Sequence, residues 1–232
     1  MGEVLQKYIA RTGYCSRRQA EKLIKEGKVW LNGKRADLGQ RVWSEDKVKV
    51  SGRRLSRDLD KVYIKLNKPP GYTCTNRSFS KEKNIFSLIK EKKRLLIAGR
   101  LDKDSRGLVF LSNDGDWVQE ITHPSFAKEK EYCVKLKFGA EKEKDKIKKE
   151  FLKGIDIGRE NGVVRAKNVQ FAGNDNFKIT LTQGKKRQIR RMFAALGLEV
   201  VDLKRIRVGQ IKLGRLKEGD WEYLKKDFVK NN

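Results

Sequence analysis

The sequence predicts an α+β protein: a small N-terminal helix-helix-β module, then a larger domain with a mixed, largely antiparallel sheet and flanking helices. Three observations lead to this prediction. Residues 1–50 hold two helical segments followed by short strands. Residues 51–60 are polar and strongly charged, which is typical of an interdomain linker. From residue 61 to residue 232, short β-like runs alternate with helical segments, a pattern that favours a mixed sheet.

Two helices are expected at the start of the N-terminal module. The first, around residues 5–9, has apolar residues at helical spacing and ends in a turn at Gly13. The second begins at Ser16, which forms a capping-box pattern with Gln19, and ends at Gly27. An Asn-Gly turn pair and alternating valines then predict short strands packed on these helices.

One face of the second helix is basic. Arg18, Lys22 and Lys25 follow one another at i, i+4 and i+7, so they line one side of the helix. Arg17 lies beside them near the helix N-terminus, where backbone amides also attract phosphate. This face is therefore predicted to bind phosphates, although the same residues could be an ordinary solvated surface.

The larger domain contains five apolar runs that predict strands and four periodic segments that predict helices. Each strand run is short and rich in β-branched or aromatic residues, whereas the helical segments carry apolar residues at wider spacing. The predicted strands cover 62–66, 95–98, 108–111, 132–138 and 177–181, and the predicted helices cover 85–90, 117–122, 141–152 and 187–196.

The charge balance indicates a polyanionic partner. The chain has 232 residues, with 56 Lys and Arg against 30 Asp and Glu, so its formal net charge is +26. A hydrophobic fraction of 38% is sufficient for a buried core. Such an excess of positive charge favours nucleic acid as the partner. Charge alone does not distinguish RNA from DNA or from an anionic membrane.

Cysteine and histidine usage argues against metal sites and export. Cys15, Cys74 and Cys133 are far apart and form no Cys-x-x-Cys pair, which fits reduced thiols in a cytoplasm. His123 is the only histidine, so no multi-histidine site can form. We find no apolar run near the roughly 20 residues of a membrane span, and the N-terminus lacks the pattern of a signal peptide. The expected protein is a cytoplasmic monomer without a metal.

The densest cluster of chemically capable residues is the segment from Gly99 to Leu108. Asp102 is flanked there by Arg100, Lys103 and Arg106, and these cations favour the ionised carboxylate. An ionised carboxylate on an exposed loop suits a nucleophile or a base. The alternative is that Asp102 is a structural partner in a salt bridge.

Four segments of this domain resemble motifs of one enzyme family. Gly-Arg-Leu-Asp at 99–102, followed by Lys-Asp-Ser-x-Gly-Leu, resembles the catalytic segment of pseudouridine synthases, in the family named after the ribosomal small-subunit enzyme. The Lys-Asp-Ser spelling is most similar to the branch that modifies large-subunit (23S) ribosomal RNA. Residues 130–132 and 183–192 resemble the second and third motifs, and 66–71 is similar to the usual opening of the catalytic domain. Residues 1–50 resemble the RNA-binding module of ribosomal protein S4.

The resemblance implies a cofactor-independent isomerisation of uridine in ribosomal RNA. The target base must leave its stack, so the enzyme needs a group that fills the gap and a surface that receives the base. By the resemblance, Asp102 is the catalytic carboxylate, as a nucleophile or as a base, Arg100 fills the gap and Tyr132 receives the uracil. The sequence does not decide between the two roles of Asp102.

The third motif implies further roles on the helix expected at 187–196. Arg190 is expected to form a salt bridge with Asp102, with Arg191 as the second choice, and Ile189 is expected to form an apolar wall beneath Tyr132. Contacts to RNA phosphates are expected from three neighbouring cations, Lys185, Lys186 and Arg187, and from Arg191.

Two other kinds of protein were weighed. A non-catalytic RNA-binding or ribosome-assembly protein on the same scaffold would account for the charge. A nuclease or methyltransferase is disfavoured, because the sequence has no acidic or His-rich metal cluster and no glycine-rich cofactor loop after a strand.

Overall fold

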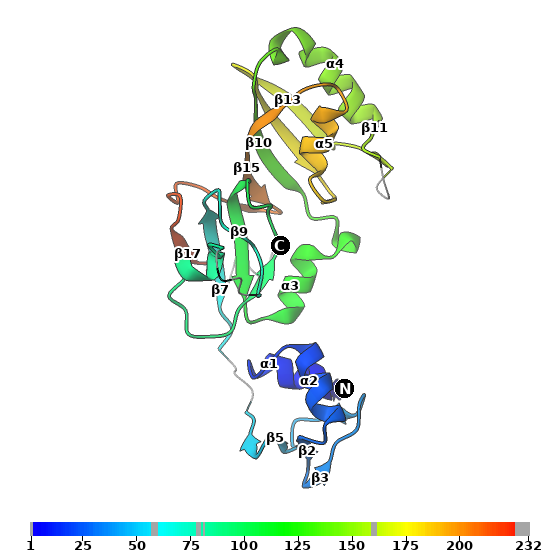
Figure 1. Ribbon diagram of the computed structural model, residues 1–232, viewed down its shortest axis with the longest axis vertical. Helices are drawn as coiled ribbons and strands as arrows, with labels where there is room; N and C mark the ends of the chain where they lie inside the picture. The colour runs from blue at the N-terminus through cyan, green and yellow to red at the C-terminus, as the bar shows by residue number, and fades with distance from the viewer. Residues whose placement is uncertain (1, 57–59, 78–79, 81, 159–161, 226–232) are drawn as a thin grey trace. The chain divides into compact units, whose positions relative to one another are not determined.

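The computed structural model describes residues 2–56, 60–77, 80, 82–158 and 162–225. The chain divides into two compact units, which are considered separately. The first unit consists mainly of residues 1–62, and the second of most of the chain from Tyr63 onward (Figure 1). An α+β fold with a small helix-helix-β module followed by a larger sheet domain was predicted, and this is confirmed.

The N-terminal module packs two helices on one face of a four-stranded sheet. Its core consists of fully buried Leu5 and Ile9 together with Val29, Val48 and Val50 from the strands. The Gln19 amide donates to the Ser16 hydroxyl oxygen at 3.2 Å, which confirms the predicted N-cap. The helices are α1 (Leu5–Arg11) and α2 (Arg17–Lys25), and the sheet order is β3 (Lys34–Arg35), β2 (Val29–Leu31), β5 (Val48–Val50) and β6 (Arg53–Arg54); β1 (Glu3–Val4) pairs separately with β4 (Arg41–Val42).

The predicted linker at 51–60 begins too early. Strand β6 pairs with β5 inside this range, and Leu55 is buried in the core of the module. The connection is a two-residue hairpin turn in which Ser51 and Gly52 both have positive φ, 46° and 80°, as a type I′ turn requires. The outer strand of this hairpin, β6, consists of two arginines, so the sequence of the segment resembles that of a charged linker. Residues 57–59 of the predicted linker lie outside the described residues.

The larger unit is built on one mixed sheet. All its strand pairs are antiparallel except β9 with β15, which is parallel, so the predicted largely antiparallel character is confirmed. The order is β13 (Asn168–Gly173), β14 (Asn176–Leu181), β10 (Lys130–Leu136), β15 (Val200–Val208), β9 (Arg106–Ser112), β7 (Tyr63–Lys68) and β17 (Trp221–Tyr223), with β16 (Ile211–Lys212) beside β15 and β8 (Leu96–Ala98) beside β9; β11 (Ile155–Asp156) pairs with β12 (Val163–Val164).

The helices of this unit agree with the predictions in two cases and differ in two. Helices α3 (Gly115–Thr122) and α4 (Ala140–Lys153) match the expected segments closely. The segment predicted as a helix at 85–90 forms only a short 3₁₀ turn, Ile85–Leu88. Helix α5 (Gln188–Ala194) starts one residue late, because Arg187 has a left-handed backbone with φ of 53°. A second 3₁₀ turn covers Pro124–Phe126.

The central strand β15 was not predicted. Its sequence, Val-Val-Asp-Leu-Lys-Arg-Ile-Arg-Val, carries four charged residues, and these obscure the alternation on which strand prediction depends. One of the four, Arg205, is only 2% exposed and points into the protein. A buried polar side chain of this kind usually has a specific structural or functional reason.

Candidate active site

Asp102 lies in a short loop between strands β8 and β9. The loop covers residues 99–105, and the Ser105 amide donates to the main-chain carbonyl of Asp102 at 3.1 Å, which closes a turn over residues 103–104. The Asp102 side chain is half-buried. Within the part of the chain that the structure describes, no hydrogen bond or ion pair uses its carboxylate. The described residues therefore leave the Asp102 carboxylate without a hydrogen-bonding or ion-pair partner.

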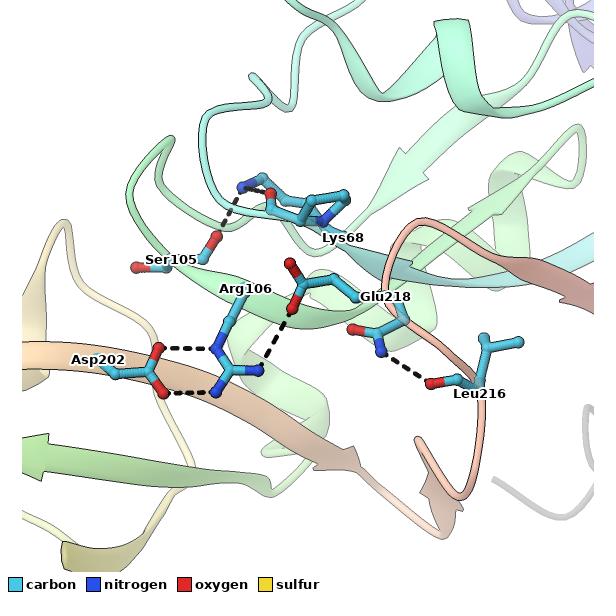
Figure 2. A network of polar contacts seen from close by, with 8 residues as sticks. Lys68, Ser105, Arg106, Asp202, Leu216 and Glu218 are labelled. Atoms are coloured by element: carbon cyan, nitrogen blue, oxygen red, sulfur yellow. Dashed lines mark hydrogen bonds and ion pairs between the residues drawn. The ribbon is translucent and has the colours of Figure 1, made fainter.

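A buried lysine holds the end of this loop. Lys68, the last residue of β7, is fully buried, and its Nζ donates to the Ser105 carbonyl at 2.6 Å (Figure 2). It also donates to the carbonyls of Pro69 at 2.9 Å and Lys103 at 3.2 Å. Burial lowers the pKa of Lys68, and the nearby acidic groups Cys74, Asp104 and Asp102 oppose this shift.

A buried arginine holds the beginning of the loop. The Arg205 guanidinium donates from Nη2 to the Gly99 carbonyl at 2.7 Å, from Nη1 to the Arg100 carbonyl at 3.4 Å, and from Nε to the Leu108 carbonyl at 2.7 Å. No carboxylate of a described residue forms an ion pair with it. The loop that carries Asp102 is thus fixed at both ends by buried cations that bind its backbone.

Tyr132 belongs to the same neighbourhood. It stands directly opposite Arg205 in the β10–β15 pair, and direct cross-strand partners share one face of a sheet. Tyr132 is 7% exposed and packs in the apolar cluster that contains Ile189 of α5. Leu101, the neighbour of Asp102 in the chain, packs against this cluster. The structure therefore brings the Asp102 loop, Tyr132 and Ile189 together.

The arginines of the third motif bind a different aspartate from the one expected. Arg190 forms an ion pair with Asp104, 3.3 Å between Nε and Oδ2, and Arg187 Nη1 lies 3.0 Å from both oxygens of the same carboxylate. The expected pair of Arg190 with Asp102 is not present, because Asp104 at the exposed tip of the turn meets the start of α5. Arg190 also donates to the Val200 carbonyl at 2.7 Å.

Arg191, the second choice for that salt bridge, is directed elsewhere as well. Its Nη2 donates to the carbonyls of Ile157 and Gly158, the latter at 2.8 Å. Arg191 therefore fixes the segment after β11 to α5 instead of reaching the loop of Asp102.

Apart from the half-buried Arg191, the expected RNA contacts are exposed in both units. Arg100, Lys185, Lys186 and Arg187 are exposed in the larger unit. In the N-terminal module, all four expected cations of α2 are exposed, and Lys22 is 3.7 Å from Glu26. These four cations are Arg17, Arg18, Lys22 and Lys25.

Three residues of the site were missed by sequence reasoning. Lys68 lies in the segment 66–71, which resembles the opening of the family's catalytic domain, but it was given no role. The one signal that could have identified it is a lysine at the end of an apolar strand run. Asp104 lies beside the predicted catalytic residue but was given no role. Arg205 has no local signal, because its partners are 97 to 106 positions away in the chain.

The comparisons with known proteins agree with this geometry. Residues 62–195 match the model of the RNA pseudouridylate synthase family, and residues 5–55 match the S4 domain. The chain belongs to the RNA pseudouridylate synthase family. The match to the S4 domain ends at Leu55, which is buried in the core of the module. The N-terminal module therefore extends beyond residue 50.

Relatives of this RNA pseudouridylate synthase match over nearly its whole length. The dual-specificity RNA pseudouridine synthase RluF of Escherichia coli (strain K12) is 41% identical over 230 residues, which are 96% of this chain and 76% of the relative. Ribosomal large subunit pseudouridine synthase B of Bacillus subtilis (strain 168) is 36% identical over 236 residues, 98% of this chain and 94% of the relative. A crystal structure of a pseudouridylate synthase superposes with a TM-score of 0.70 and 31% identity and covers 98% of each chain.

Two features are absent from the described residues. No group of three or more His, Cys, Asp or Glu side chains is placed to hold a metal ion within those residues. The helices described are all too short or too polar to cross a bilayer.

Proposed function

We propose that this pseudouridine synthase converts uridine to pseudouridine in large-subunit ribosomal RNA, with Asp102 as the catalytic carboxylate. The observation that carries the proposal is the half-buried Asp102, unused by any described residue, on a loop fixed at both ends by buried Lys68 and Arg205. Relatives named as large-subunit enzymes support the choice of RNA.

The chemistry needs one carboxylate and no added atom. The glycosidic bond between C1′ and N1 of the uridine breaks, the uracil turns, and a new bond forms between C1′ and C5. The proton lost from C5 is balanced by the proton gained at N1. An ionised Asp102 can attack C1′ or remove a ribose proton, and both routes give the same product.

The other residues of the site bind and orient the substrate. Tyr132 stacks against the extruded uracil, with Ile189 as the apolar wall beside it, and Arg100 enters the gap left in the RNA. We assign Arg190 a positioning role: its ion pair with Asp104 fixes the turn that follows Asp102 relative to α5. Lys185, Lys186 and Arg187 bind phosphates, as do the cations of α2.

The test is to map pseudouridine by carbodiimide-stop sequencing in RNA from cells with and without the gene. We expect at least one stop in the large-subunit RNA to disappear without the protein and to return when the native chain is expressed again. If no stop changes, the protein is a binding or assembly factor on this scaffold, and the proposal is wrong.

The proposal takes the enzyme to be a cytoplasmic monomer. The catalytic residues named above all come from one chain, so no second copy is needed to complete the site. Sedimentation of the purified protein is expected to give the mass of a single chain, 26.9 kDa.

A further inference from the structure

The outer face of the N-terminal sheet carries a line of exposed side chains that has no role so far. Trp30 on β2 stands directly opposite Arg35 on β3 and Lys49 on β5, and Lys49 stands directly opposite Arg54 on β6. Direct partners project from the same face, so the four side chains form one row across the four strands. We call Arg35, Trp30, Lys49 and Arg54 the Trp30 row.

The Trp30 row faces away from the helices of the module. Residues that alternate with it, Val29, Val48 and Val50, are fully buried against α1 and α2. Figure 1 shows both helices on one side of these strands. The row and the basic face of α2 are therefore separate surfaces, and nothing in the S4-like pattern of α2 requires the row.

The chemistry of the row is cationic and aromatic. Trp30 is 38% exposed, and the Arg35 guanidinium carbon lies 5.9 Å from the centre of its ring. The four strands contain no acidic residue, and no ion pair of a described residue involves the three cations of the row. An exposed indole is costly in water, and three neighbouring cations without an acidic partner in the protein repel one another, so a polyanion that covers the row would relieve both effects.

We infer that the Trp30 row binds an unpaired segment of RNA, with one base stacked on the indole of Trp30 and neighbouring phosphates bound by Arg35, Lys49 and Arg54. RNA is taken as the polyanion because the proposed function makes RNA the substrate. Aromatic rings set among cations are how proteins bind single strands without reading their sequence. With strands spaced about 4.8 Å apart, the row extends over about 14 Å, enough for a nucleotide and its flanking phosphates.

The experiment compares Trp30→Ala with Trp43→Ala in the full-length protein. Trp43 is a matched control: it is also exposed in the same module, at 53%, but its neighbour is Asp46, which accepts a hydrogen bond from its amide. Affinities for a short fluorescein-labelled oligouridylate and for an RNA duplex of equal length are measured by anisotropy. We expect Trp30→Ala to weaken binding of the single strand about tenfold, which is the loss of one stacked base. Duplex binding and the Trp43→Ala variant should remain at the native level.

A second pair of variants tests the cations. Lys49→Gln combined with Arg54→Gln should reduce the slope of log affinity against log salt by about 1.4, since each phosphate that is no longer neutralised lowers the slope by about 0.7. Trp30→Phe retains a stacking ring and should keep most of the native affinity, in contrast to Trp30→Ala. All these sites are exposed, so the unfolding midpoints should equal that of the native chain.

Three results would overturn the inference. The first is an unchanged affinity in Trp30→Ala, and the second is an equal loss in Trp43→Ala. The third is an unchanged salt slope in the double variant, which would assign the row to another partner such as an acidic protein surface. Asp102→Asn should bind the oligouridylate like the native protein, so failure of the proposed catalysis and failure of the Trp30 row are distinguishable.

Discussion

At the scale of single residues, the site depends on cations that bind backbone rather than carboxylates. Lys68 and Arg205 are buried at 0% and 2% exposure, and the bonds described for both end at main-chain carbonyls, most of which belong to the 99–105 loop. Burying a charge is costly unless hydrogen bonds compensate it. Here most of the compensation comes from the loop itself, so bonds that make the buried charges tolerable also fix the position of Asp102.

Lys68→Met tests this account. The substitution keeps the volume but leaves the carbonyls of Ser105, Pro69 and Lys103 without their donor, so we expect the free energy of unfolding to fall by about 3 kcal/mol. The conversion rate should fall more than the RNA affinity, because the loop loses its position while the exposed cations remain. Urea unfolding and single-turnover conversion measure the two effects. Lys103→Met, an exposed lysine of the same loop, is the control, and equal effects of the two changes would contradict the account.

At the scale of elements, the parallel contact between β9 and β15 supports the loop. Gly107 stands opposite Arg205 there, and an added Cβ would lie 2.3 Å from the Arg205 carbonyl oxygen, so only glycine fits. Next to it, the Arg106 guanidinium forms two bonds of 2.7 Å to the two oxygens of Asp202 (Figure 2). These contacts keep the strand that carries Arg205 against the strand that follows the loop.

The pair of Arg106 with Asp202 predicts a dependence of stability on pH. The hydrogen bonds from Arg106 lower the pKa of Asp202 in the folded state, against the smaller effect of burial. The ion pair therefore contributes its full stabilisation at pH values above the pKa of Asp202 in the unfolded chain, about 3.9. This contribution is lost as the pH falls through the lower pKa that Asp202 has in the folded protein.

The corresponding variant is Asp202→Asn. At neutral pH we expect it to reduce the free energy of unfolding by about 1 to 2 kcal/mol, and the difference from the native chain should vanish in strong acid. Urea unfolding over a pH series checks both points. Glu218→Gln is a control, since its single contact with Arg106 is longer, at 3.3 Å. A difference that is independent of pH would show that the ion pair is not its cause.

Local patterns predicted the elements that have local causes. Ser16 and Gln19 identified the start of α2, and the Gly-Arg-Leu-Asp segment identified the Asp102 loop. Strand β15 and the role of Arg205 could not be predicted, because a buried arginine breaks the apolar alternation and its partners are distant in the chain. The predicted salt-bridge partner of Arg190 was wrong for a similar reason. The sequence does not distinguish Asp102 from Asp104 as a partner, because only the folded turn determines which of the two carboxylates lies against α5.

At the scale of the whole molecule, charge governs the encounter with RNA. The net charge of +26 is spread over both units, since the exposed cations of α2 and those at 185–187 belong to different units. Each cation that neutralises a phosphate releases a counter-ion, and this release makes binding sensitive to salt. Long-range attraction of this kind speeds association but does not select the uridine.

The salt dependence of RNA affinity is therefore expected to be steep. If six exposed cations each bind a phosphate of an unpaired RNA, the slope of log affinity against log salt should be about −4. Arg18→Glu should reduce the magnitude of this slope, whereas Asp145→Asn on α4, which removes an exposed negative charge instead, should not. Filter binding across a salt series is the measurement. A nearly flat dependence would contradict the assignment of a polyanionic partner.

The central claim concerns the carboxylate of Asp102, and the most direct test is single-turnover conversion of large-subunit RNA by Asp102→Asn with the enzyme in excess. Asparagine has the same shape but no charge, so we predict no detectable pseudouridine, with unchanged RNA affinity and an unchanged unfolding midpoint. Asp145→Asn, an exposed aspartate outside the site, should convert at the native rate. Conversion by Asp102→Asn at a rate equal to that of the native enzyme would contradict the account.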